Sequence, residues 1–130
     1  MIYGALDPKT GQIKYTNGGH DCPILFKKNQ EPTELESTGL ILGIFEESEY
    51  TQESIQLESG DLLLIFSDGI TEAMDSDLEM YGTNRLLELV QTQADKPVSE
   101  IGSIILESVR EHAGSNTQSD DITLMLIKKD

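Results

Sequence analysis

Cysteine, aromatic residues and long apolar runs are all scarce in this sequence of 130 residues. The one cysteine, Cys22, excludes an internal disulfide and favours a reducing compartment. No stretch approaches the roughly 18 consecutive apolar residues of a membrane-spanning helix, and the first residues lack the basic and apolar regions of a signal peptide. We therefore expect a cytoplasmic protein. Aromatic residues make up only 5% of the chain, so its core should be aliphatic.

Positive charge is scarce as well. The chain has 9 lysines and arginines against 24 aspartates and glutamates, which gives a net charge of -15. A nucleic-acid surface needs a basic patch and an anionic membrane repels an acidic protein, so we expect no nucleic acid and no membrane contact. An acidic protein can still act on an anionic substrate if its carboxylates hold metal ions that reverse the local field.

The most informative stretch runs from Asp61 to Glu72. Its five consecutive apolar residues, Leu62–Phe66, predict a short strand that is buried on both faces. Asp68 and Gly69 follow almost at once, so a carboxylate would stand at the edge of the core. Asp-Gly is also a strong signal for a hairpin turn, although the residues after it do not alternate as a returning strand would. This stretch alone leaves both interpretations open.

Other segments predict further strands. Residues 1–6 and 12–16 flank a turn that contains proline and glycine, and they predict a β-hairpin. The apolar segment 38–44 is flanked by glycines and is expected to be a packed loop or a short strand. The run Ile122–Ile127 predicts a last buried strand, and we expect it to lie next to the strand Leu62–Phe66.

Two helices are expected between these two strands. Thr83 is a reasonable N-cap for a helix over residues 83–94, which carries apolar side chains on one side. Residues 98–113 predict a second helix, because apolar residues recur there at steps of three and four. Both helices should pack on one face of the sheet, so the fold class expected is α+β.

Acidic residues stand at the ends of both expected core strands. Asp68 follows the first strand, and Asp120 and Asp121 precede the second. If the strands are antiparallel neighbours, these carboxylates lie at the same edge of the sheet. Like charges repel and burial penalises each of them, so such a group requires a cation. Oxygen ligands without a cysteine or histidine cluster suit Mg²⁺ or Mn²⁺ better than zinc.

Four motifs occur in order along the chain. They are Tyr-Thr-Asn-Gly-Gly-His-Asp-Cys-Pro at 15–23, Leu-Ile-Leu-Gly-Ile at 40–44, Gly-Asp-Leu-Leu-Leu-Ile-Phe-Ser-Asp-Gly-Ile-Thr-Glu at 60–72 and Asp-Asp-Ile-Thr at 120–123. Together they resemble the bacterial protein-phosphatase-2C-like domains, which are metal-dependent serine phosphatases often named after the sporulation stage II protein E domain. The resemblance covers essentially the whole chain.

The resemblance implies a fold and a site. The fold is an antiparallel β-sandwich flanked by helices, with a two-metal site of Mn²⁺ or Mg²⁺ at one edge. The aspartate of Ser-Asp-Gly and the first aspartate of Asp-Asp-x-Thr are metal ligands in the family, which implies Asp68 and Asp120 here. His20 is implied as a catalytic-site residue near the metal edge. The supporting residues implied are Asn17, Gly69, Asp121 and Thr123, of which the last two would orient Asp120 or cap the strand.

The sequence also departs from the family pattern. It lacks the Asp-x-x-Gly-His-Gly motif and a further upstream aspartate, which supply bridging metal ligands in the family. We therefore expect residues 1–130 to be the second half of one phosphatase domain, with its N-terminal portion missing, and to be inactive alone. In a complete domain a metal-activated water would attack phosphoserine in line. The substrate implied is a phosphorylated regulatory protein, such as an anti-anti-sigma factor.

Two other functions remain open. A catalytically dead or truncated domain could bind a protein partner through its helices or a bare sheet edge. Metal-dependent release of phosphate discriminates the two functions, because such a domain would show none. An acidic calcium-binding module is weaker, because the segment 75–77 lacks the glycine and terminal glutamate of such a loop. A sandwich without one half would also expose apolar strand faces, so we expect a homodimer or larger assembly through the sheet.

Overall fold

Seven strands and three helices make up the computed structural model, which describes residues 1–116 and 120–130. The strands are β1 Ile2–Leu6, β2 Gln12–Asn17, β3 Ile24–Phe26, β4 Thr33–Glu34, β5 Glu53–Gln56, β6 Leu62–Phe66 and β7 Leu124–Lys128. The helices are α1 Asp68–Thr71, α2 Thr83–Gln93 and α3 Val98–Ala113. Among these described residues, no helix combines the length and apolarity that a membrane crossing demands.

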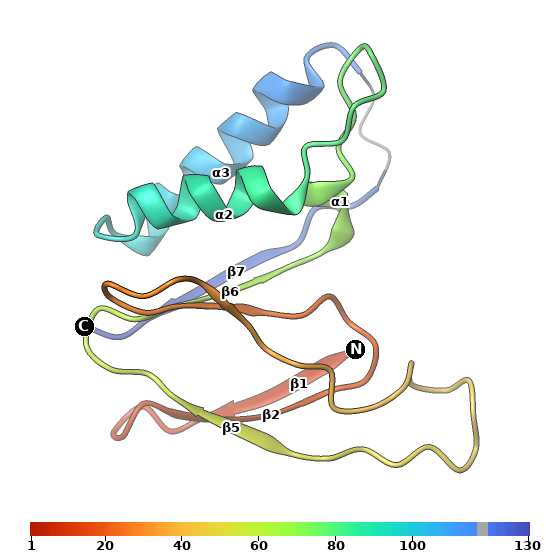
Figure 1. Cartoon of the computed structure of the whole chain (residues 1–130), viewed down its shortest axis with the longest axis vertical. Helices are drawn as coiled ribbons and strands as arrows, with labels where there is room; N and C mark the ends of the chain where they lie inside the picture. Colours follow the sequence, from red (N-terminus) through yellow and green to blue (C-terminus); the bar gives the residue numbers. More distant parts are fainter. Residues whose placement is uncertain (117–119) are drawn as a thin grey trace.

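The strands form two antiparallel sheets, one of order β1-β2-β5 and one of order β4-β3-β6-β7. Figure 1 shows the resulting layers, with α2 and α3 covering the outer face of the four-stranded sheet and the three-stranded sheet lying against its other face. The expected β-sandwich flanked by helices is therefore confirmed. The predicted hairpin is also confirmed, because β1 pairs with β2 from Ile2 opposite Asn17 to Leu6 opposite Ile13.

Strand β6 is apolar throughout because it contributes to two cores. Leu62, Leu64 and Phe66 belong to the core beneath the helices, and Leu63 belongs to the core between the sheets, together with Ile13. Burying each such side chain contributes about 1.5–3 kcal/mol to folding. The helices supply Leu86, Val90, Ile101, Ile105 and Val109 to the first core. Both predicted helices thus pack on the same face of the sheet, as expected.

The pairing of β6 with β7 confirms that the two predicted core strands are adjacent. Leu64 lies opposite Leu126 at the centre of this antiparallel ladder. The boundaries of the second strand differ from the prediction, since β7 begins at Leu124 rather than Ile122. The backbone N–H of Thr123 donates to the hydroxyl of Ser67 instead of to a strand carbonyl, so the ladder ends there.

Three local predictions need correction. Thr83 is the first residue of α2 and Gly82 is its N-cap, with a φ of 81° that favours glycine over a hydroxyl residue. Asp68 and Gly69 begin the short helix α1 rather than turning into a returning strand, so the hairpin interpretation is wrong. Residues 38–44 form a loop with one isolated bridge from Gly39 to Gly18, and much of its apolar surface is exposed rather than packed.

Candidate functional site

Ser67 holds the acidic ends of β6 and β7 together. Its backbone N–H donates to the carbonyl of Thr123 at 3.0 Å, and its Oγ accepts from the N–H of Thr123 at 2.9 Å. The same hydroxyl donates to the carbonyl of Asp121 at 3.0 Å. The two strand ends therefore lie side by side, as the sequence predicts. No role of Ser67 is predicted from the sequence, although its hydroxyl directly after a buried strand is the available signal.

Gly69 lets the two backbones approach each other closely. A Cβ atom at this position would lie 2.5 Å from the carbonyl oxygen of Asp121 and 3.3 Å from that of Asp120. The first distance is shorter than real Cβ contacts, so a larger residue would push the 120–121 segment away. Asp121 and Thr123 contact Ser67 through backbone groups, and their predicted task of orienting Asp120 or capping the strand stays a prediction.

Asp68 and Asp120 both expose their side chains at this edge. Asp68 stands in the first turn of α1, where its carbonyl accepts the N–H of Glu72 at 2.8 Å. Asp120 Oδ1 accepts the N–H of Asp121 at 2.7 Å, which orients that carboxylate. Carboxylate oxygens are suitable donors for Mg²⁺ or Mn²⁺. Within the described part of the chain, however, no three histidine, cysteine or acidic side chains are arranged to hold a metal ion. The type of ligand therefore suits these ions, but the number of ligands is too small.

The loop that follows β2 is organised by Asn17, whose side chain is fully buried. Its Oδ1 accepts the N–H of His20 at 2.8 Å and its Nδ2 donates to the carbonyl of His20 at 2.9 Å. Its backbone N–H donates to Thr38 Oγ1 at 2.6 Å. The observed contacts of Asn17 therefore fix the shape of the loop rather than presenting an amide to a ligand.

His20 is half-buried, and its ring points one nitrogen at the main chain. Nδ1 lies 2.8 Å from the carbonyl oxygen of Asp21, which can only accept, so Nδ1 carries the proton in a neutral ring and Nε2 remains an acceptor. His20 lines a cavity of about 440 Å³ between the two sheets, together with Phe66 and Thr123. The loop after β2 therefore reaches the same end of the sandwich as the acidic strand ends.

The rest of that cavity is mostly apolar. The gap lies between the inward faces of the two sheets, and its remaining lining residues are Met1, Ile2, Gly4, Leu6, Ile13, Tyr15, Pro23, Leu35, Leu63, Ile65, Met125 and Ile127. Among these residues only the Tyr15 hydroxyl and the Met1 amino group, which donates to the carbonyl of Gly18 at 3.0 Å, are polar beyond the ordinary main chain, so the gap suits an apolar group better than a phosphate.

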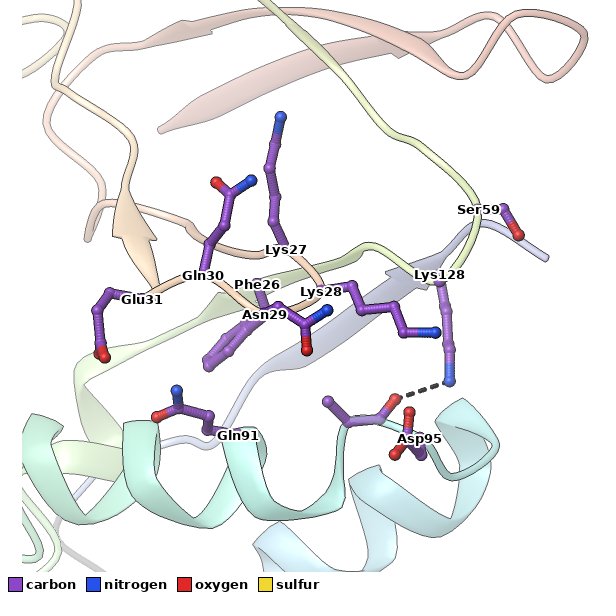
Figure 2. Close-up of a pocket in the computed structure, with 12 residues that line it drawn as sticks. Phe26, Lys27, Lys28, Asn29, Gln30, Glu31, Ser59, Gln91, Asp95 and Lys128 are labelled. Carbon is purple, nitrogen blue, oxygen red and sulfur yellow. Dashed lines mark hydrogen bonds between the residues drawn. The ribbon is translucent and has the colours of Figure 1, made fainter.

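A second, polar hollow of about 610 Å³ lies at the other end of β6 and β7 (Figure 2). Lys27, Lys28 and Lys128 line it, which is notable in a chain of net charge -15. Lys128 Nζ donates to the carbonyls of Ala94 at 2.7 Å and Lys96 at 3.0 Å. These carbonyls follow the end of α2, where a cation is favourable, so Lys128 has a structural explanation.

The acidic loop after α1 shows no calcium-type arrangement. Asp75 Oδ1 accepts the backbone N–H groups of Asp77 at 2.9 Å and Glu79 at 3.0 Å. The hydrogen bond from the N–H of Glu79 is the largest cause that lowers the pKa of Asp75, and the hydrogen bond from Asp77 lowers it further. The carboxylate therefore closes the loop on itself, and no metal-holding group of three includes it in the described residues.

Cys22 has a packed, unreactive environment. Its half-buried thiol lies 3.8 Å from Asn17 Nδ2, and no partner cysteine exists in the chain. Burial, followed by the charge of Glu34, raises the pKa of the Cys22 thiol above its ordinary value. A protonated thiol is a poor nucleophile, so Cys22 does not have the character of a catalytic residue.

Comparison with known proteins agrees with this geometry. The family described as Stage II sporulation protein E (SpoIIE) matches residues 1–130. Phosphoserine phosphatase RsbU of Bacillus subtilis (strain 168) is 33% identical over 91 residues, which are 68% of this chain and 27% of RsbU. The RsbU and RsbW domains of Rv1364c from Mycobacterium tuberculosis match with a TM-score of 0.76 and 28% identity, over 96% of this chain and 34% of that one.

A further solved structure supports the fold alone. The SiaA-PP2C domain of Pseudomonas aeruginosa has a TM-score of 0.81 at 19% identity, over 94% of this chain and 48% of that domain. The chain spans only 15% to 30% of the length of the curated relatives that it matches. The activity of a whole protein therefore does not transfer to these residues without further argument.

Proposed function

The chain belongs to the Stage II sporulation protein E (SpoIIE) family, and from this premise we propose that it is the second half of a metal-dependent protein serine/threonine phosphatase domain. The observation that carries the proposal is the set of three hydrogen bonds at Ser67, which brings the ends of β6 and β7 together. Asp68 and Asp120 stand at those ends. In this proposal they are the two metal ligands that the chain contributes.

The residues of the chain have distinct tasks at this edge. Asp68 and Asp120 would hold Mn²⁺ or Mg²⁺, and such ions, when bound, make water more acidic and neutralise the phosphoryl oxygens. Ser67 and Gly69 keep the two strand ends close together, which would hold Asp68 and Asp120 at the same edge of the sheet. His20 would stand near the site with Nε2 available as an acceptor. No side chain of this half is required as a nucleophile.

The chain alone should be inactive because its ligand set is incomplete. A bridged pair of ions needs a carboxylate between them, and several oxygens must surround each ion. Asp68 and Asp120 are two exposed carboxylates, and the described residues contain no group of three acidic, histidine or cysteine side chains that could hold an ion, so the chain alone supplies too few ligands. Each missing charged ligand removes attraction on the order of a few kcal/mol in a partly buried site.

The substrate class proposed is phosphoserine on a regulatory protein in the cytoplasm, such as an anti-anti-sigma factor. The similarity to RsbU, a phosphoserine phosphatase, supports the phosphoserine part of this proposal. A non-enzymatic role is the alternative, in which the same fold binds a protein without hydrolysing phosphate. The absence of a group of three metal-ligating residues in the described chain is the observation that favours this alternative.

Phosphate release separates the two functions. The 130-residue chain alone should hydrolyse p-nitrophenyl phosphate no faster than Mn²⁺ in buffer. Joined to a first half that carries the Asp-x-x-Gly-His-Gly motif, it should become Mn²⁺-dependent, and Asp68→Ala or Asp120→Ala should abolish that activity. Asp95→Ala is the matched control, because Asp95 is an exposed aspartate that lines the polar hollow at the other end.

Two results would refute this scheme. Robust turnover by the 130-residue chain would refute the missing-ligand argument. Full activity of the joined Asp68→Ala variant would refute the assignment of the ligands.

A further inference from the structure

An exposed apolar ridge borders the loop of the candidate site. It consists of the side chains of Leu40, Ile41, Leu42, Ile44 and Phe45, which are 48% to 61% exposed. Scattered exposed leucines are ordinary, but five large apolar side chains within six consecutive residues form a contiguous patch. Patches of this kind mark surfaces that bind another molecule. The ridge is therefore a candidate interaction surface.

The first part of the ridge is fixed against the loop that follows β2. The N–H of Leu42 donates to the carbonyl of Gly18 at 3.2 Å, and Gly39 forms a parallel bridge with Gly18. Ile41 packs closely on Gly19, since a Cβ atom added at Gly19 would lie 2.5 Å from the side chain of Ile41. A surface that is already ordered loses little conformational entropy on binding, which favours recognition.

The position of the ridge links it to the acidic edge. Gly18 and Gly19 directly precede His20, and His20 lines the same cavity as Phe66 and Thr123. A protein that bound the ridge would therefore contact the loop that carries His20, and a large protein would extend from there toward the ends of β6 and β7. The ridge is placed to hold a large substrate while its phosphate group reaches the site.

The charges around the ridge indicate the chemistry of its partner. Glu46, Glu47 and Glu49 follow Phe45 directly, and all three are exposed. A complementary surface is apolar at its centre and carries lysine or arginine at its rim. A second copy of this chain fits poorly, because two ridges face to face would bring these glutamates together in molecules of net charge -15.

We propose that this apolar ridge is the docking surface for the protein substrate of the phosphatase, and that the substrate meets it with an apolar patch rimmed by basic residues. The catalytic consequence of docking rests on the proposed function. The binding itself does not, because the ridge contains none of the proposed metal ligands.

A selection from a random peptide library tests the binding without metal. A library of displayed 12-residue peptides is selected on the 130-residue chain in EDTA, so that neither a metal ion nor catalysis contributes. The selected peptides should combine leucine, isoleucine or phenylalanine with lysine or arginine. Ile44→Ser and Phe45→Ser should each weaken their binding roughly tenfold, and circular dichroism should show an unchanged fold because both side chains are exposed.

Leu78→Ser is the matched control. Leu78 is 73% exposed and lies between two acidic residues, Asp77 and Glu79, so it offers the same combination of apolar and acidic surface away from the ridge. Its substitution should leave binding unchanged. Equal weakening by Leu78→Ser would show general attraction to an acidic protein, and selected peptides without basic residues would refute the charge argument. A change of sedimentation in Phe45→Ser would show instead that a second copy covers the ridge.

The outcome is separable from that of the phosphatase proposal. Peptide binding should persist in the Asp68→Ala variant, whose ridge is intact. If the joined domain hydrolyses phosphate but no peptide requires the ridge, only the docking proposal fails. If peptides bind the ridge but the joined domain is inactive, only the phosphatase proposal fails.

Discussion

Gly69 is the residue on which the close approach of the two acidic strand ends depends most directly. In Gly69→Ala the added methyl group would lie 2.5 Å from the carbonyl oxygen of Asp121, which is backbone and cannot rotate away. The 120–121 segment must shift, and such overpacking costs about 1–3 kcal/mol. We expect urea denaturation to show this loss in the free energy of unfolding. The joined phosphatase domain should lose Mn²⁺ affinity as well.

Gly102→Ala provides the comparison. Gly102 lies inside α3, and a Cβ there would meet Leu126 Cδ1 at 3.7 Å, an ordinary contact with a flexible side chain. Alanine is favoured over glycine in a helix interior by about 0.5–1 kcal/mol. This variant should therefore gain stability. Equal losses at both glycines would contradict the role given to the close contact at Gly69.

Cys22 should react slowly with alkylating reagents near neutral pH. Burial raises the pKa of its thiol, so the reactive thiolate forms only at higher pH than in an unfolded chain. The rate of iodoacetamide labelling against pH should rise later in the folded protein than in urea. For the same reason the contribution of Cys22 to stability is complete below the unfolded pKa and is lost as the pH rises through the folded one. Identical labelling profiles would contradict this.

The candidate site was only partly readable from the sequence. Asp68 and Asp120 could be proposed because each stands next to an apolar run that had to be a buried strand. The role of Ser67 depends on hydrogen bonds to residues 54 and 56 positions away, which no local pattern reveals. Asn17 was predicted from its motif as a supporting residue of the site, and its burial and its hydrogen bonds to His20 and Thr38 show how it fixes the loop, which the motif alone does not reveal.

At the scale of single elements, α3 should be the helix that stability depends on most. Ile105 is fully buried in the core beneath the helices, so Ile105→Ala should cost about 2–5 kcal/mol. Val98 is 38% exposed at the start of the same helix, and Val98→Ala should change stability by less than about 0.5 kcal/mol. Chemical denaturation of both variants measures this difference. Similar losses would show that the helix is not seated as described.

Elements were predicted well where periodicity was strong and poorly where a terminus depended on one residue. The steps of three and four in α3 and the apolar run in β6 located both elements, because burial imposes those patterns over several residues. The N-cap of α2 was predicted one position too late, since Gly82, with its positive φ, takes that position instead of Thr83. The short helix α1 was missed because Asp-Gly favours a turn when tertiary contacts are unknown.

At the scale of the whole molecule, the gap between the two sheets is open where β1 and β7 lie at the sheet edges. Each of these strands has one neighbour among the described strands, and Leu6 and Met125 are 44% and 55% exposed beside the gap. Unpaired edges next to apolar side chains favour association. We expect the isolated chain to form a homodimer or larger assembly through this face.

Sedimentation at tens of micromolar measures this association, since weak protein interfaces are populated at roughly that concentration. Met125→Lys should shift the chain toward the monomer, because it places a charge within the proposed contact. Met80→Lys is its matched control, with a methionine 53% exposed in the acidic loop. A monomeric parent chain, or equal effects of the two lysines, would contradict association through the gap.

The three bonds at Ser67 also have a consequence for how the protein is made. Ser67 and Asp121 are 54 residues apart, so at about 5–20 residues per second a ribosome needs roughly 3–11 s to synthesise the second strand end after the first. During that interval β6 has β3 on one side and nothing on the other, and its apolar run is open to chaperones. A ribosome stalled before Asp120 would therefore hold a nascent chain in which Asp68 exists without the acidic residues of the second strand end.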